Sequence, residues 1–125
     1  MIDRLGGWRL EMTEGAGISQ LVYLGNNCVV DRQTRSIMRY QKVIRLTDIE
    51  YRILECLIEY AGQIVSFKTI IEYVWVDHYT GTRENLNVHI MRLRKRVEDN
   101  HRSPKLIVTV RGIGYILVLQ GYRVV

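Results

Sequence analysis

The sequence feature that most constrains the fold is one long segment of helical periodicity in the second half of the chain. It begins after Thr82, a good N-cap residue, and extends to about Asn100, before the helix-breaking Pro104. Its apolar residues recur at spacings of four, three and four, and they are Leu86, Ile90, Leu93 and Val97. At about 100° per residue, these side chains fall within a stripe roughly 60° wide. The pattern predicts a long helix that packs on one side only.

The opposite face of this helix is basic and chemically mixed. Its centre carries Glu84, Val88, Met91, Arg92 and Lys95, flanked by Asn85, His89 and Arg96 on one side and by Asn87 and Arg94 on the other. A helix that needed only solubility would more often carry Glu/Lys pairs. The major groove of DNA is about 12 Å wide and admits one helix, and there Arg recognises guanine, Asn adenine, Glu cytosine and apolar groups the thymine methyl. The face therefore favours DNA as a partner, although a solvated surface is the common alternative for such charges.

The positive charge of the chain is concentrated around this helix. Eighteen Lys and Arg oppose thirteen Asp and Glu, which gives a net charge of +5. Residues 83–111 hold eight basic and three acidic side chains, whereas residues 47–75 hold two basic and five acidic ones. A basic segment favours a polyanionic partner, and an apolar content of 47% is typical of a globular protein rather than a disordered tail.

Strands precede and follow the helical part of the chain. Tight turns separate five β-rich runs, which predict an antiparallel meander over Trp8–Met12, Gln20–Leu24, Cys28–Val30, Arg35–Met38 and Val43–Leu46. Two further runs, Leu106–Val110 and Tyr115–Leu119, flank a turn with two glycines at residues 111–114. These two runs predict a terminal hairpin.

Two shorter helices are predicted between the strands and the long helix. Thr47 and Glu50 have the spacing of a capping box, and Gly62 suits a left-handed residue at the end of that helix. Ser66 is a good N-cap for a second helix of about ten residues. A short helix followed by a long one matches the helix-turn-helix layout, in which the second helix reads the major groove.

Four motifs together resemble a known family. They are L-T-x-x-E-Y-x-I-L at Leu46–Leu54, V-W at Val74 and Trp75, N-V-H-I-x-R-L-R-K at Asn87–Lys95 and T-V-R-G-x-G-Y at Thr109–Tyr115. Their order and spacing are similar to those of the winged-helix output domain of OmpR/PhoB-type response regulators, the DNA-binding part of bacterial two-component systems. The resemblance implies an α+β fold: a winged helix-turn-helix with an N-terminal antiparallel β-sheet, three helices and a C-terminal β-hairpin wing.

The resemblance implies a single winged-helix domain over residues 1–125. Its parts are an N-terminal extension or extra strand at 1–20, the antiparallel sheet at 21–46, a three-helix core at 47–100 and the wing at 105–119. A receiver domain does not fit into the 46 residues before the first helix. We therefore expect a standalone cytoplasmic regulator, an excised domain, or the cytoplasmic part of a ToxR/CadC-like membrane-anchored regulator.

The resemblance also implies a function, a sequence-specific double-stranded DNA-binding transcription regulator. We expect a monomer in solution and a head-to-tail dimer on promoter DNA, with the third helix (about 83–100) in the major groove. The wing is expected on phosphates or in the minor groove. The implied DNA-binding residues are Trp75, Arg83, Asn85, Val88, His89, Arg92, Arg94, Lys95, Arg96, Thr109, Arg111 and Tyr115. The implied contact loop for RNA polymerase consists of Val76, Asp77, His78, Tyr79, Thr80 and Gly81.

Two positions depart from the family pattern. Glu84 stands where many members carry Arg, and Met91 stands where a polar residue or Arg is common. Both departures affect the expected base preference and leave the expected fold unchanged. The rival hypothesis is a winged-helix protein–protein interaction module without direct DNA reading, because Val88 and Met91 could serve an apolar interface.

Nothing in the sequence indicates an enzyme, a metal site, a cofactor or a small-molecule substrate. The histidines show no ligand spacing, and Cys28 and Cys56 are expected to be reduced core thiols. Gly112-x-Gly114 lacks the third glycine and the following helix of a nucleotide-binding loop. No nucleophile has a neighbouring His and acid, and no apolar run is long enough to span a membrane.

Overall fold

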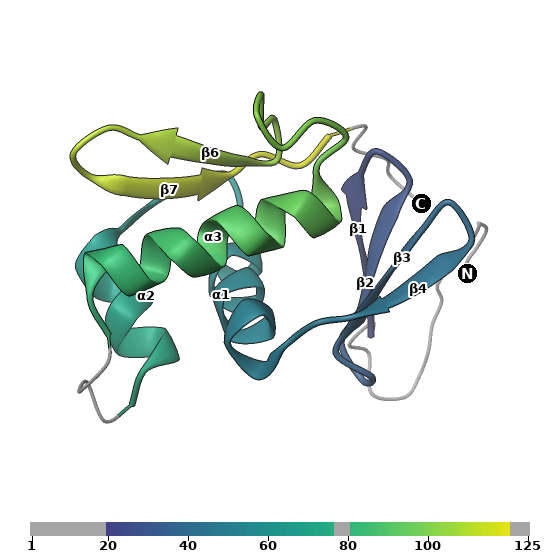
Figure 1. Ribbon diagram of the computed structural model, residues 1–125, viewed down its shortest axis with the longest axis horizontal. Coiled ribbons are helices and arrows are strands. Elements are labelled where there is room, and N and C mark those ends of the chain that lie inside the picture. Colours follow the sequence, from purple (N-terminus) through teal and green to yellow (C-terminus); the bar gives the residue numbers. More distant parts are fainter. Residues whose placement is uncertain (1–19, 77–80, 121–125) are drawn as a thin grey trace.

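The computed structural model describes residues 20–76 and 81–120 of the chain. In this part of the chain, three helices lie between two antiparallel sheets (Figure 1). The predicted α+β order of sheet, helices and terminal hairpin is confirmed. The predicted strand Trp8–Met12 lies outside the described residues.

The N-terminal sheet is an antiparallel meander whose strands follow chain order. Its strands are β1 (Leu21–Gly25), β2 (Cys28–Asp31), β3 (Ser36–Arg39) and β4 (Lys42–Arg45). The β1–β2 and β3–β4 connections are the pairs Asn26–Asn27 and Tyr40–Gln41, and all four residues have positive φ. Two-residue turns of this kind match the right-handed twist of the strands that they join.

The three helices begin at the predicted N-caps. They are α1 (Asp48–Glu59), α2 (Phe67–Val74) and α3 (Arg83–Val97), capped by Thr47, Ser66 and Thr82. The capping box is complete, because the Thr47 hydroxyl accepts from the Glu50 backbone N–H at 3.1 Å and the Glu50 carboxylate accepts from the Thr47 N–H at 3.0 Å. α3 ends at Val97, three residues before the predicted end, where the chain becomes extended at Glu98.

The second sheet contains a strand that the sequence analysis did not predict. β5 (Ile64–Ser66) pairs with β7 (Gly114–Leu117), which in turn pairs with β6 (Ile107–Val110). A strand of three residues is too short to show an alternating pattern. Gly114 permits the close β5–β7 pairing, because a Cβ at this position would lie 1.8 Å from the Val65 carbonyl oxygen.

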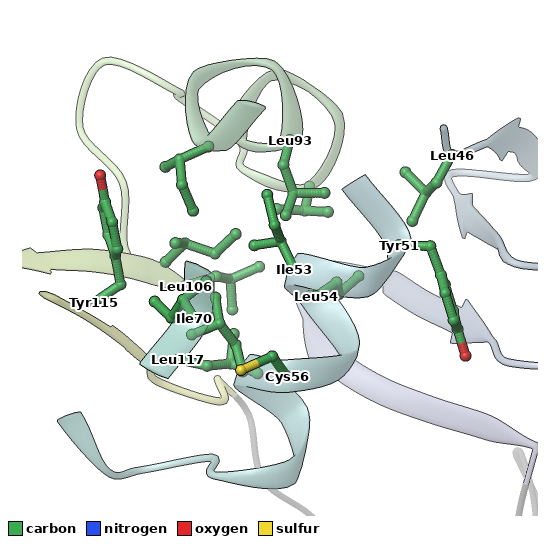
Figure 2. Packing of buried hydrophobic residues seen from close by; sticks show 14 of the residues in the cluster. Leu46, Tyr51, Ile53, Leu54, Cys56, Ile70, Leu93, Leu106, Tyr115 and Leu117 are labelled. Atoms are coloured by element: carbon green, nitrogen blue, oxygen red, sulfur yellow. The ribbon is translucent and has the colours of Figure 1, made fainter. Parts of the chain in front are cut away.

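The core forms where α1 lies against α3, α2 and the second sheet. All four apolar side chains of the predicted inner stripe of α3 are fully buried. Figure 2 shows Leu93 of α3 beside Ile53 of α1, with Leu46 and Tyr51 on the side of the N-terminal sheet. Burial of each aliphatic side chain stabilises the fold by about 2 kcal/mol, so this stripe fixes which side of α3 faces outward.

Candidate nucleic-acid interface

The outer face of α3 consists of Glu84, Val88, Met91, Arg92 and Lys95, and all five side chains are exposed. Val88 is 44% and Met91 51% exposed, which is unusual for apolar residues on a helix whose other apolar side chains are fully buried. In residues 20–76 and 81–120, the guanidinium of Arg92 and the ammonium of Lys95 make no hydrogen bond or ion pair. The outer face therefore presents two unpaired cations beside two apolar side chains.

The wing lies beside α3, as Figure 1 shows. Its turn carries Arg111, which is exposed, and Gly112, which has a φ of +77° that glycine adopts without strain. Ile113, also in the turn, is half exposed and accepts a backbone hydrogen bond from Phe67 at the start of α2. This bond ties the backbone of the wing turn, which carries Arg111, to the start of α2.

Arg94 joins α3 to the wing. Its Nε donates to the Ile107 carbonyl and its Nη2 to the Thr109 hydroxyl, each at 2.9 Å. Its guanidinium also lies 5.6 Å from the centroid of the Tyr115 ring. Arg94, one of the residues implied to bind DNA, is thus half buried and hydrogen-bonded to the wing.

Tyr115 and Trp75 are the two aromatic residues among the implied DNA-binding residues, and the structure buries both. Their exposed fractions are 3% and 8%. Tyr115 packs edge-to-face against Phe67, and burial raises the pKa of its hydroxyl while the charges of Arg94 lower it in part. Both rings therefore pack against neighbouring aromatic rings, Tyr115 against Phe67 and Trp75 against His89.

His89 lies at the edge of the outer face and is half buried. Its ring packs against that of Trp75, with 5.9 Å between the centroids. Burial lowers the pKa of His89, the nearby Arg92 lowers it further, and Glu50 raises it in part. Its Nδ1 atom is buried and makes no hydrogen bond within the part of the chain that the structure describes.

Arg96 is turned toward the protein and pairs with Glu50. The Arg96 Nε lies 2.9 Å from the Glu50 Oε1, in an orientation that gives an ion pair without a hydrogen bond. The Glu50 side chain is 1% exposed, so Arg96 neutralises a buried carboxylate. This pairing differs from the DNA contact that the sequence suggested for Arg96.

Arg83 and Asn85 lie in the first turn of α3, and both are exposed. The Arg83 guanidinium stacks 4.1 Å from the centroid of the Phe67 ring, and the Asn85 backbone N–H donates to the Thr82 hydroxyl at 3.1 Å. The start of α3 is therefore attached to the start of α2.

Three residues that were not predicted from the sequence hold the C-terminal end of α3. Glu98 is 4% exposed, and its carboxylate accepts backbone hydrogen bonds from residues 105, 106 and 107 at 2.7 to 3.0 Å. Arg39 of β3 donates to the carbonyls of Arg96 and Glu98 and to the Asp99 carboxylate. We call Arg39, Glu50, Arg96, Glu98 and Asp99 the α3 anchor.

One signal could have pointed to the anchor. An acidic side chain at a helix C-terminus is unfavourable, because the last carbonyls carry partial negative charge. Glu98 stands there, so a compensating partner was to be expected. The partners themselves, three backbone N–H groups beyond the helix, leave no pattern in the sequence.

The loop predicted to contact RNA polymerase is described only at its two ends. Val76 is exposed, and Gly81 packs on α2, where a Cβ would lie 2.7 Å from the Ile71 Cγ2. Asp77, His78, Tyr79 and Thr80 lie outside the described residues.

Both cysteines are buried and free, and burial raises their pKa, to about 12 for Cys28 and about 11 for Cys56. Among the residues that the structure describes, no three His, Cys, Asp or Glu side chains gather as metal ligands. No helix in the same ranges is long and apolar enough to cross a bilayer.

Known relatives share this architecture. The family model "Transcriptional regulatory protein, C terminal" matches residues 41–117. The regulatory protein VanRc of Enterococcus gallinarum is 37% identical over 95 residues, which are 76% of this chain and 41% of that protein. The DNA-binding dual master transcriptional regulator RpaA of Synechocystis is 36% identical over 106 residues, 85% of this chain and 44% of RpaA. The chain thus spans less than half the length of these relatives.

Solved structures agree with the sequence matches. The response regulator DrrB, a Thermotoga maritima OmpR/PhoB homolog, has a TM-score of 0.70 at 29% identity, covering 79% of this chain and 44% of DrrB. The Klebsiella pneumoniae RstA DNA-binding domain, solved in complex with the RstA box, has a TM-score of 0.69 at 27% identity, covering 82% of this chain and all of that domain. These matches confirm the resemblance of the four motifs: the chain belongs to the OmpR/PhoB-type family of transcriptional regulatory protein C-terminal domains.

Proposed function

We propose that this protein binds double-stranded DNA in a sequence-specific manner and thereby regulates transcription. The observation that carries the proposal is the outer face of α3, where Arg92 and Lys95 are exposed beside Val88 and Met91 and have no partner among the described residues. Cations of this kind neutralise phosphates and contact guanine, and exposed apolar side chains contact thymine methyl groups. The fully buried inner stripe holds this face outward.

The exposed residues divide into two roles. Arg92 lies in the centre of the outer face and is proposed to read a base in the major groove. Arg111, at the wing turn, is proposed to bind a phosphate or enter the minor groove. Thr109 and Arg94 connect the wing to α3, since the Arg94 guanidinium donates a hydrogen bond to the Thr109 hydroxyl.

The relatives support the proposal. RstA is described with its DNA box, and RpaA is named a DNA-binding transcriptional regulator. We extend to this chain the remaining features that the family suggests: action in the cytoplasm, head-to-tail pairing on direct repeats, a monomeric state off DNA, and contact with RNA polymerase through the loop at 76–81. Selection of bound duplexes from a random pool, followed by footprinting, tests the pairing, because direct repeats support a head-to-tail arrangement and inverted repeats contradict it.

A protein-binding role is the second candidate, favoured by the exposed Val88 and Met91. Salt distinguishes the two. DNA binding through several cations weakens by about 10³-fold or more between 50 and 200 mM salt when six or more phosphates are contacted, because counterions are released. An apolar protein interface changes little over this range. Affinity for the selected duplex that is insensitive to salt would contradict the DNA proposal.

Two variants test the assigned roles on that duplex. Arg92→Ala is expected to cost about 1–3 kcal/mol of binding and to relax the preference at one base pair, whereas Arg111→Ala weakens all sequences about equally. Lys42→Ala, on the edge strand β4, removes one charge that lies on neither the outer face of α3 nor the wing, and it serves as the control. Equal affinities of all three variants and the wild type would refute this use of α3.

A further inference from the structure

We propose that Met91, supported by Val88, reads a thymine methyl group, so that the preferred DNA site holds a thymine facing the middle of α3. The inference rests on the proposed DNA binding and names one feature of the target. It concerns a residue at which this chain departs from the family pattern.

Met91 and Val88 form one apolar patch on the outer face. They are three positions apart in the helix, which places them next to each other on its surface. Their exposed fractions are 51% and 44%, whereas Leu86, Ile90 and Leu93 on the same helix are fully buried. The patch therefore lies outside the core, and its exposed half contributes free energy only when a partner covers it.

The Met91 side chain is partly ordered before any partner binds. The Asn87 side-chain amide lies one turn earlier and donates a weak hydrogen bond to the Met91 sulfur at 3.9 Å. A side chain that is already held loses less conformational entropy on binding than a free one. The contact favours a reading role over a merely solvated position.

The neighbouring charges select the kind of partner. Arg92 follows Met91 directly, and Lys95 lies one turn later on the same face, both unpaired in the described residues. A polyanion neutralises these cations, whereas an apolar protein surface would leave them desolvated and unpaired. In the major groove, the apolar group that a base pair offers is the C5-methyl of thymine. Methionine facing the donors and acceptors of other bases would leave those groups without partners.

Deoxyuridine provides the test, because it differs from thymidine by the methyl group alone. A duplex selected from a random pool with the full chain is synthesised with each thymidine replaced in turn. For the wild type, we expect one replacement to weaken binding about fourfold, the factor that burial of one methyl-sized group contributes. Met91→Ala should bind the selected duplex and this deoxyuridine duplex with the same affinity. Met91→Leu should restore the difference in affinity between the two. Val43→Ala, an exposed apolar change on β4, is the matched control and should behave as the wild type.

The outcomes separate this inference from the proposed function. Sequence-preferring binding with no loss at any deoxyuridine, or with a loss that Met91→Ala retains in full, overturns the inference and leaves DNA binding intact. Absence of any preference for duplex DNA overturns both. Thermal unfolding of Met91→Ala at the wild-type temperature shows that the fold is unchanged, as expected for a half-exposed residue.

Discussion

The outer face of α3 and the α3 anchor both contain basic and acidic side chains, and they use them in opposite ways. In the anchor, Arg39, Arg96 and Glu98 each meet a partner inside the protein. On the outer face, Arg92 and Lys95 meet none among the described residues. The difference lies in what is opposite each side chain, because another chain segment covers the anchor and nothing described covers the outer face.

This difference shows how α3 is held in one orientation while its outer face stays exposed. The anchor connects the end of α3 to β3 and to the start of β6, while Arg94, in the last turn of α3, connects the helix to the wing. A helix held by its buried stripe and its end presents its outer face in one orientation. Substitutions in the anchor should therefore affect stability, and substitutions on the outer face should affect binding.

The largest effect is expected for Glu98→Ala. The change removes the acceptor for three backbone N–H groups, two of them on the buried residues Leu106 and Ile107. Unpaired buried donors cost about 1–3 kcal/mol each, so we expect a loss of about 4 kcal/mol in the free energy of unfolding by urea. Glu84→Ala, an exposed carboxylate on the same helix, should change it by less than about 0.5 kcal/mol. Equal effects of the two substitutions would remove the distinction between anchor and outer face.

The second effect concerns the buried carboxylate of Glu50. Arg96→Met leaves this carboxylate without its cation, and we expect a loss of about 3 kcal/mol in urea unfolding. The double variant Glu50→Gln/Arg96→Met should regain part of the loss, because no unpaired charge remains. Lys95→Met, one residue earlier and exposed, is the control and should change stability little. A double variant less stable than Arg96→Met would contradict the ion pair.

Arg39→Met should have a smaller effect. The guanidinium donates to the last carbonyls of α3, where a cation is favourable, and its loss is expected to cost about 1–2 kcal/mol. Arg35→Met also breaks an ion pair, with Asp48, but both of its partners are about half exposed. Exposed pairs contribute little, so this control should stay within about 0.5 kcal/mol. Thermal unfolding with similar shifts for both variants would mean that Arg39 does not cap α3.

The smallest effect is a pH dependence from His89. Burial and Arg92 hold the pKa of His89 below its ordinary value, so the unfolded chain binds its proton more tightly than the folded one. The contribution of neutral His89 to the free energy of unfolding is fully present above about pH 6.5, and it is lost as the pH falls through the lowered pKa. Urea unfolding at pH 7.5 and 5.5 should show lower stability at pH 5.5, and His89→Gln should reduce this difference. His101→Gln, at an exposed position, should leave the difference unchanged.

Most elements of the fold could be predicted from the sequence because their signals are local. Thr47, Ser66 and Thr82 each bond to a backbone N–H three residues later, and these spacings are visible in the chain. The inner stripe of α3 follows from helical periodicity alone. The strand β5 could not be predicted, since three residues carry no pattern and its partner β7 lies far along the chain.

The candidate site could be predicted only in part. The exposure of Val88, Arg92 and Lys95 followed from their position opposite the buried stripe. The internal roles of Arg94 and Arg96 did not, because an arginine side chain is long enough to turn either outward or back to the protein. Only the positions of Thr109 and Glu50 in space decide between the two.

The sequence by itself determined where each helix begins, which side of α3 is buried and that a hairpin ends the described chain. These properties depend on residues within a few positions of one another. The tertiary structure alone decided which cations are neutralised inside the protein and which remain for a partner, because that depends on atoms brought together from β3, α1, α3 and β6. Periodicity sets the direction of a side chain from the helix axis, but the free energy of a charge depends on what lies opposite it in space.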